Sequence, residues 1–247
     1  MKLLLVNKGG KGSGHHGHVG RRGEVGGSIP GKGTNAPKEK VLSSEITPYG
    51  HTWRSLNNLS KDTKFYIIDK GKLSKGKLPQ AATMRTEYVR LVKSFPKLPA
   101  SDISEVHLQP ENENKGEKFA EGVTGLTIPM FGVINIHASD DAPDSGDYVL
   151  GRKGKKGQTG VVDPSLLGAF RHEIGHMVAY SKKQAFTKFK GIVTKLGRKN
   201  LGKTISTYGS AQGADELFAE AFSAFTHNNY SGDLPREVDN FFRRMFR

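Results

Sequence analysis

The sequence contains no cysteine, which excludes disulfide bonds and thiolate metal ligands for all 247 residues. Any metal ion held by this chain must therefore be bound by histidine, aspartate or glutamate. Apolar residues make up only 35% of the composition and aromatic residues 9%, which is low for a chain that packs along its whole length. We therefore expect part of the sequence to lie outside the folded core.

Acidic residues are also scarce. The chain has 24 Asp and Glu against 38 Lys and Arg, and its formal net charge is +14. Such an excess favours contact with polyanions, such as nucleic acid or an acidic partner, through long-range attraction. A generally basic surface without a dedicated partner explains the same charge equally well.

Long hydrophobic runs are absent. The apolar run at residues 3–6 ends at once in Asn7-Lys8-Gly9-Gly10, which is too short for a secretory signal peptide. No segment approaches the roughly 20 apolar residues that a membrane span requires. We therefore expect a soluble protein without membrane contact.

Glycine is concentrated at the N-terminus, where eleven of the 31 glycines fall between Gly9 and Gly33 among basic residues. Because this stretch has almost no large apolar residues, it cannot bury enough surface to offset its chain entropy. We expect residues 1–45 to form a flexible basic tail that contacts nucleic acid or other polyanions weakly. Residues 46–247 are then the folded domain.

The folded domain is predicted to be α+β, with a small mixed sheet followed by a helical half. Short apolar runs predict strands at 64–69, 105–109, 125–128 and 132–137. Apolar residues at helical spacing predict helices at 80–94, 184–196, 213–226 and from about 234 to the C-terminus. A further helix is predicted up to residue 181, with Asp163 as its cap and Pro164 in its first turn.

The chemistry-bearing motif is His172-Glu173-Ile174-Gly175-His176, which lies inside this helix. Residues four apart share one helix face, so both imidazoles can bind one metal ion while Glu173 lies beside it as a general base. An apolar stripe occupies the opposite face: Leu166, Leu167, Phe170, Ile174, Met177 and Val178. A solvated polar face that happens to carry two histidines is the alternative.

A second helical run, from Asp215 to Phe225, places Glu216 and Glu220 one turn apart and opposite its apolar stripe. Small neighbours make that face too apolar for bulk water, and a buried carboxylate needs a cation or hydrogen-bond donors. A zinc ion with two histidine ligands needs a third protein ligand and an open position. One of these glutamates is therefore the candidate third ligand, unless both are simply exposed.

The motif, Ser206-Thr207-Tyr208-Gly209 and Glu216-Leu217-Phe218-Ala219-Glu220-Ala221-Phe222 together resemble the catalytic domain of anthrax lethal factor-like zincins over about residues 160–226. The resemblance implies a zincin-like metallopeptidase fold and one zinc ion held by His172, His176 and Glu216. It also implies that Glu220 orients a ligand histidine, although the residues alone leave the reverse assignment of the two glutamates open.

The same resemblance implies that Tyr208 donates a hydrogen bond to the substrate carbonyl in a zinc-dependent endopeptidase reaction. In zincins the strand at the place of residues 133–137 is the sheet edge and pairs with the substrate. Asn135 and His137 are therefore the expected substrate-binding residues. The protein or peptide substrate itself and the oligomeric state do not follow from the sequence.

The tail suggests a biological setting. Residues 17–28, rich in Gly and Arg, are similar to stretches of phage head and portal-associated proteins. This similarity implies a phage or prophage origin and a location in the host cytoplasm or the virion. Two alternatives to an active peptidase follow: a structural or nucleic-acid-binding phage component with an inactive zincin domain, or a toxin-like effector peptidase.

Overall fold

The computed structural model describes residues 43–46, 52–55, 64–68, 77–110, 123–138, 142–151 and 160–246. Residues 1–42 of the expected tail lie outside these ranges, so its flexibility stays a prediction. The expected domain boundary after residue 45 falls inside strand β1 (Ser43–Ile46). Among the described residues, no helix has the length and apolar character needed to span a bilayer.

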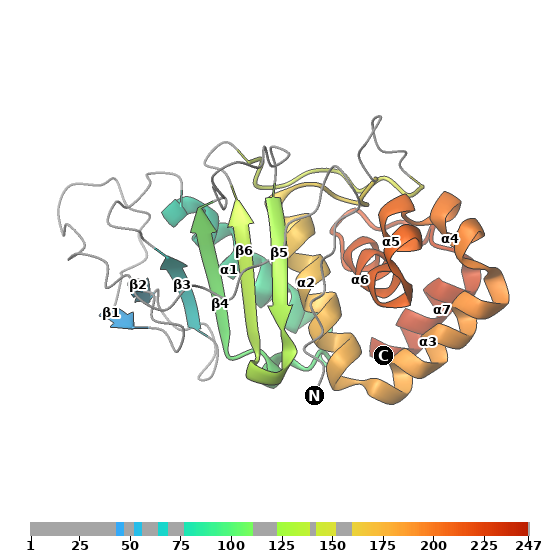
Figure 1. Cartoon of the computed structure of the whole chain (residues 1–247), viewed down its shortest axis with the longest axis horizontal. Helices are drawn as coiled ribbons and strands as arrows, with labels where there is room; N and C mark the ends of the chain where they lie inside the picture. Colours follow the sequence, from blue (N-terminus) through green and yellow to red (C-terminus); the bar gives the residue numbers. More distant parts are fainter. Residues whose placement is uncertain are drawn as a thin grey trace.

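A mixed sheet of six strands occupies the left half of Figure 1, in the order β1-β2-β3-β4-β6-β5. The remaining strands are β2 (Thr52–Ser55), β3 (Lys64–Ile68), β4 (Glu105–Pro110), β5 (Val123–Ile128) and β6 (Val133–Ala138). β4 runs parallel to β3 and β6, whereas β5 is antiparallel to β6 and ends the described sheet. The turn between β5 and β6 (Pro129–Phe131) closes at Gly132, whose φ of 67° suits a residue without a side chain.

Helix α1 (Lys77–Ser94) connects β3 to the parallel strand β4 and covers one face of the sheet. It forms because Ala81, Met84, Tyr88 and Leu91 recur at helical spacing, and all four are at most 1% exposed. It ends at Ser94, shortly before Pro96, because the residue that precedes a proline disfavours helical geometry.

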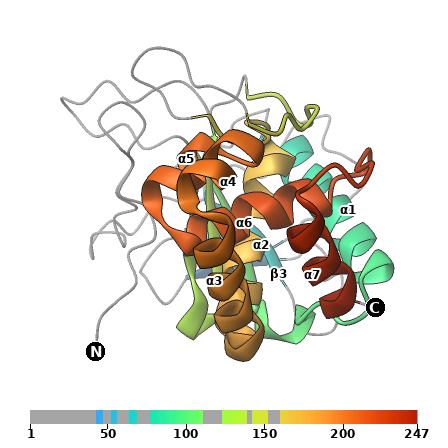
Figure 2. The ribbon, with the colours of Figure 1, turned by 90° about the vertical axis from the view of Figure 1, so that its right-hand side faces the viewer.

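After β6, the regular elements of the described residues are all helices (Figures 1 and 2). These helices are α2 (Leu166–Ser181), α3 (Lys183–Leu196), α4 (Arg198–Thr204), α5 (Thr207–Gln212), α6 (Ala214–Phe225) and α7 (Arg236–Phe246). The prediction of a mixed α+β fold with a helical C-terminal half is therefore confirmed.

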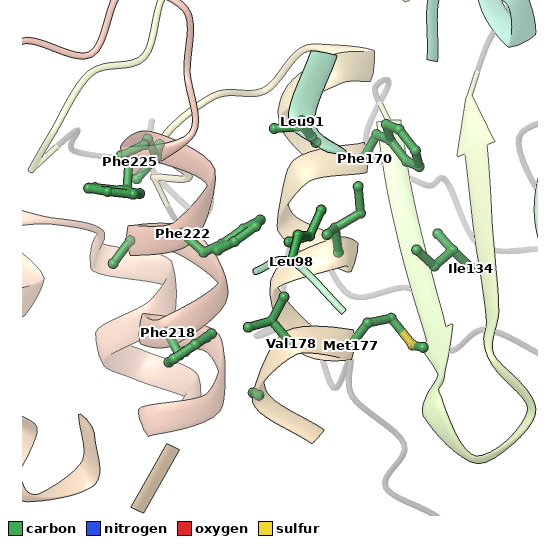
Figure 3. Packing of buried hydrophobic residues seen from close by; sticks show 14 of the residues in the cluster. Leu91, Leu98, Ile134, Phe170, Met177, Val178, Phe218, Phe222 and Phe225 are labelled. Carbon is green, nitrogen blue, oxygen red and sulfur yellow. The ribbon is translucent and has the colours of Figure 1, made fainter. Parts of the chain in front are cut away.

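Helix α2 lies between the sheet and the other C-terminal helices and is buried on both sides. Figure 3 shows Phe170 and Met177 pointing toward the sheet, whereas Val178 points toward Phe218 and Phe222 of α6. Because water has almost no access to this helix, any polar side chain on it requires a partner within the protein. The buried polar residues of α2 therefore indicate where the functional site lies.

One sequence-based expectation about the helical half is wrong, and two short helices were missed. Ser165, rather than Asp163, caps α2, since its hydroxyl accepts a hydrogen bond of 3.1 Å from the backbone N–H of Gly168. The Asp163 carboxylate instead accepts the N–H of Ser165 and pairs with the buried Arg171. Helices α4 and α5 were not predicted, because such short segments have little helical stability until neighbouring elements pack on them.

Candidate metal centre

The two motif histidines face each other on α2, one turn apart. Their Nε2 atoms lie 3.0 Å from each other, and the exposed fractions of His172 and His176 are 8% and 5%. Together with Glu173 they form a buried group whose ligand atoms all lie within 4.8 Å of one another. This group can hold a metal ion.

Helix α6 brings Glu216 to the same point. Its Oε2 atom lies 3.0 Å from Nε2 of His172 and 3.5 Å from Nε2 of His176. This oxygen is fully buried and accepts no hydrogen bond of good geometry, despite its short distance to His172. Three atoms that carry lone pairs thus converge, an arrangement that requires a proton or another cation between them.

The pKa values reflect the same requirement for positive charge. Burial alone lowers the pKa of His172, but hydrogen bonds and negative charge from Glu216 and Glu220 outweigh it and raise this pKa well above the usual value. Burial alone raises the pKa of Glu216, but the neighbouring charge of His176 and the close approach of both histidines bring it far below the usual range. These directions favour a positive charge beside the ionised carboxylate of Glu216.

Glu220 lies behind His172 rather than beside the Nε2 atoms. Its Oε1 accepts from Nδ1 of His172 at 2.8 Å, and its Oε2 accepts the backbone N–H of Val162 at 2.6 Å. In the neutral imidazole, a proton held on Nδ1 leaves Nε2 as the electron-pair donor, which is the tautomer that a metal ligand needs. Of the two glutamates, the structure thus directs Glu216 toward both Nε2 atoms and Glu220 away from them.

Glu173 turns toward strand β5. Its Oε2 accepts a 2.7 Å hydrogen bond from the Thr127 hydroxyl, and Gly125 lies directly against its carboxylate. Burial raises the pKa of Glu173, while the nearby histidine charges and Thr127 oppose this shift. A raised pKa suits a group that accepts and returns a proton near neutral pH.

Tyr208, on α5, lies beside His172 and Glu216. Its ring centre lies 6.1 Å from that of His172, and its hydroxyl is hydrogen-bonded to Glu216. Burial and the negative charge of the surrounding glutamates raise the pKa of this phenol well above its usual value. Tyr208 is therefore a neutral hydrogen-bond donor at any physiological pH.

Small residues allow α2 and α6 to approach closely enough for these contacts. A Cβ atom on Gly175 would lie 2.8 Å from Cα of Ala219, which is closer than real Cβ atoms come. Ala219 lies between Glu216 and Glu220 on α6. Gly175 thus allows α2 and α6 to approach closely enough for Glu216 and Glu220 to contact the histidines.

The expectation for Asn135 and His137 is wrong in its structural basis. Strand β6 lies inside the sheet, between β4 and β5, so it is not an edge that can pair with a substrate. Gly125 and Thr127 face α2, and they pair with Ile136 and Ile134 of β6. Directly paired residues lie on the same face of a sheet, so Ile134 and Ile136 also face α2. Because side chains alternate along a strand, Asn135 and His137 point to the face of the sheet away from α2.

The chain matches no protein-family model, no curated protein and no solved structure. The chemistry of the site must therefore be inferred from its own geometry. That geometry brings together His172, Glu173, His176, Tyr208, Glu216 and Glu220. It adds Thr127 and Gly125, which no sequence motif indicated.

Proposed function

We propose that this chain is a zinc-dependent endopeptidase with a zincin-like fold, in which Glu173 is the general base. The observation that carries the proposal is the convergence of the Nε2 atoms of His172 and His176 with the buried, unsatisfied Oε2 of Glu216. No pair among these three atoms is more than 3.5 Å apart.

The donor set fits zinc. A tetrahedral zinc ion with bonds of about 2.0–2.1 Å spaces its ligand atoms about 3.3–3.4 Å apart. The three distances of 3.0, 3.0 and 3.5 Å are of this size. Two imidazoles and one carboxylate, with a fourth position left for water, are also the typical ligands of catalytic rather than structural zinc.

Each remaining residue has a role that its position supports. A zinc ion bound there would lower the pKa of a water molecule and polarise the substrate carbonyl. Glu173 takes the proton of the attacking water and passes it to the leaving amine, for which its raised pKa is suitable. Tyr208 donates a hydrogen bond to the carbonyl oxygen as negative charge develops on it. Glu220 keeps His172 in the required tautomer.

Metal content and proteolysis of the purified full-length chain test this proposal together. We expect one zinc ion per chain in the wild type and in Glu173→Gln, because the glutamine leaves the three ligands in place. His176→Ala should lose the zinc, and both variants should lose cleavage of a general substrate such as casein. His227→Gln, which removes an imidazole outside the site, should keep both the metal and the activity.

Thermal unfolding gives a second readout that needs no substrate. Zinc at about 100 times its dissociation constant stabilises the folded state by about 2.7 kcal/mol, which a chelator should remove in the wild type but not in His176→Ala. A wild-type chain that binds no stoichiometric metal would disprove the proposal. Full cleavage by Glu173→Gln would disprove the assigned general base while leaving the metal site intact.

A further inference from the structure

Helices α3 and α7 lie on the face that Figure 2 turns toward the viewer. Residues of both helices line a groove, which shares no residue with the metal centre. Its volume is about 570 Å³. The floor is mostly apolar, and the rim is basic. The floor consists of Ala185, Ile192, Phe241 and Met245, and the basic rim consists of Lys188, Lys195 and Arg244.

The floor of the α3–α7 groove is supported by the core beneath it. The Phe241 ring lies 5.5 Å from that of Phe189 and 6.1 Å from that of Phe218, both of which are fully buried. Phe241 itself is only half-buried, as are Ile192 and Met245. The apolar floor is thus held in place by packing and offers surface that a ligand can remove from water.

The rim carries positive charge that the protein leaves almost unopposed. Glu237 is the one acid among the described lining residues, and its carboxylate lies 3.5 Å from the Lys195 amine in an exposed pair. Exposed pairs of this kind contribute little, so both partners stay available. The segment that includes the α3 wall, residues 174–214, contains eight Lys and Arg and no Asp or Glu, whereas the α7 wall carries Glu237 and Asp239.

We propose that the α3–α7 groove docks an acidic amphipathic helix of a partner protein. Two or three apolar side chains of that helix fill the floor, and its carboxylates meet the rim formed by Lys188, Lys195 and Arg244. The inference concerns binding and does not depend on the proposed peptidase activity.

The shape and charge of the groove disfavour other occupants. A second copy of this chain has the same net charge of +14, so long-range repulsion opposes its approach. A flat anionic bilayer would reach the rim but leave the recessed floor empty. The phosphates of a nucleic acid would also pair with the basic rim, yet they offer no apolar surface to pack on Ile192 and Met245.

Fluorescence anisotropy with the full-length protein tests the proposal. The probe is a labelled helical peptide of about 16 residues with Leu and Phe on one face and Glu on the other. The double variant Lys188→Glu and Arg244→Glu should weaken binding at least tenfold. The matched variant Lys199→Glu and Lys203→Glu, which makes the same charge change at exposed positions outside the groove, should weaken it less than threefold.

Two further comparisons separate docking from general attraction. A peptide of the same composition with its apolar residues scattered around the helix should bind at least tenfold more weakly, and Ile192→Ala should weaken only the segregated peptide. Equal losses in the two double variants, equal affinity for both peptides, or no measurable binding would overturn the proposal. Complete displacement of the peptide by an equimolar DNA duplex would overturn it as well, in favour of a nucleic-acid surface.

Discussion

The contact between strand β5 and the carboxylate of Glu173 can be tested by replacing Gly125 with alanine. The added Cβ would lie 2.4 Å from Oε1 and 2.6 Å from Cδ of Glu173, whereas an ordinary contact begins at 3.4 Å. The carboxylate must therefore retreat by about 1 Å, the displacement at which a catalytic group loses about 100-fold in rate. Since Cγ of Glu173, at 2.5 Å, must shift together with the carboxylate, we expect an overpacking cost of about 1–3 kcal/mol.

The assay measures proteolysis, zinc content and unfolding of the same Gly125→Ala preparation. We expect about 1% of wild-type cleavage with full zinc occupancy, because the three ligand atoms do not touch Gly125. Gly191→Ala is the matched control, since a Cβ at this position of α3 meets no atom within 4 Å. It should keep wild-type activity and gain about 0.5–1 kcal/mol of stability. Wild-type cleavage by Gly125→Ala would refute the role assigned to the position of Glu173.

Three further predictions concern other parts of the site and its support. Gly175→Ala should destabilise the protein by about 1–3 kcal/mol and weaken zinc binding, because its Cβ would meet the Ala219 backbone at 2.8 Å. Chemical denaturation and zinc titration measure these two effects. An unchanged denaturation midpoint would contradict the prediction. Tyr208→Phe should keep its zinc but lose about 10²–10³-fold in kcat, and an effect on KM alone would contradict the donor role. Burial alone raises the pKa of Glu87, but hydrogen bonds from two arginines bring it below the usual 4.5. Its stabilising effect is therefore complete above pH 4.5 and is lost as the pH falls through the lowered value. Glu87→Gln, which weakens the pairing of the buried Arg171, should lower stability by about 1–3 kcal/mol at neutral pH and flatten its acid dependence in denaturation curves from pH 6 to pH 3.

Much of the site could be predicted because its residues lie on two helices with clear periodicity. The four-residue spacing of His172 and His176, and of Glu216 and Glu220, puts each pair on one helix face whatever the fold. Where such a face is buried, its polar side chains need an oppositely charged group or a hydrogen-bond partner. The helix ranges were predicted to within a few residues for the same reason, except where short segments such as α4 and α5 depend on packing.

Residues on the strands could not be placed in the same way. Thr127 reaches Glu173 because β5 packs against α2, and this packing depends on contacts between distant parts of the chain. The expectation that β6 is the edge strand, on which the prediction for Asn135 and His137 rested, was wrong. A strand pattern shows which residues alternate, but it does not show which face is turned toward α2.

Local chemistry is thus contained in the sequence itself: the absence of cysteine limits the metal ligands to imidazoles and carboxylates, and helical spacing pairs them. Only the tertiary structure decided that Glu216 faces both Nε2 atoms while Glu220 accepts from Nδ1 of His172. The physical reason is the crossing of α2 and α6 at Gly175 and Ala219. How closely two helices approach depends on side-chain volume at their contact, a property of the pair that neither helix determines alone.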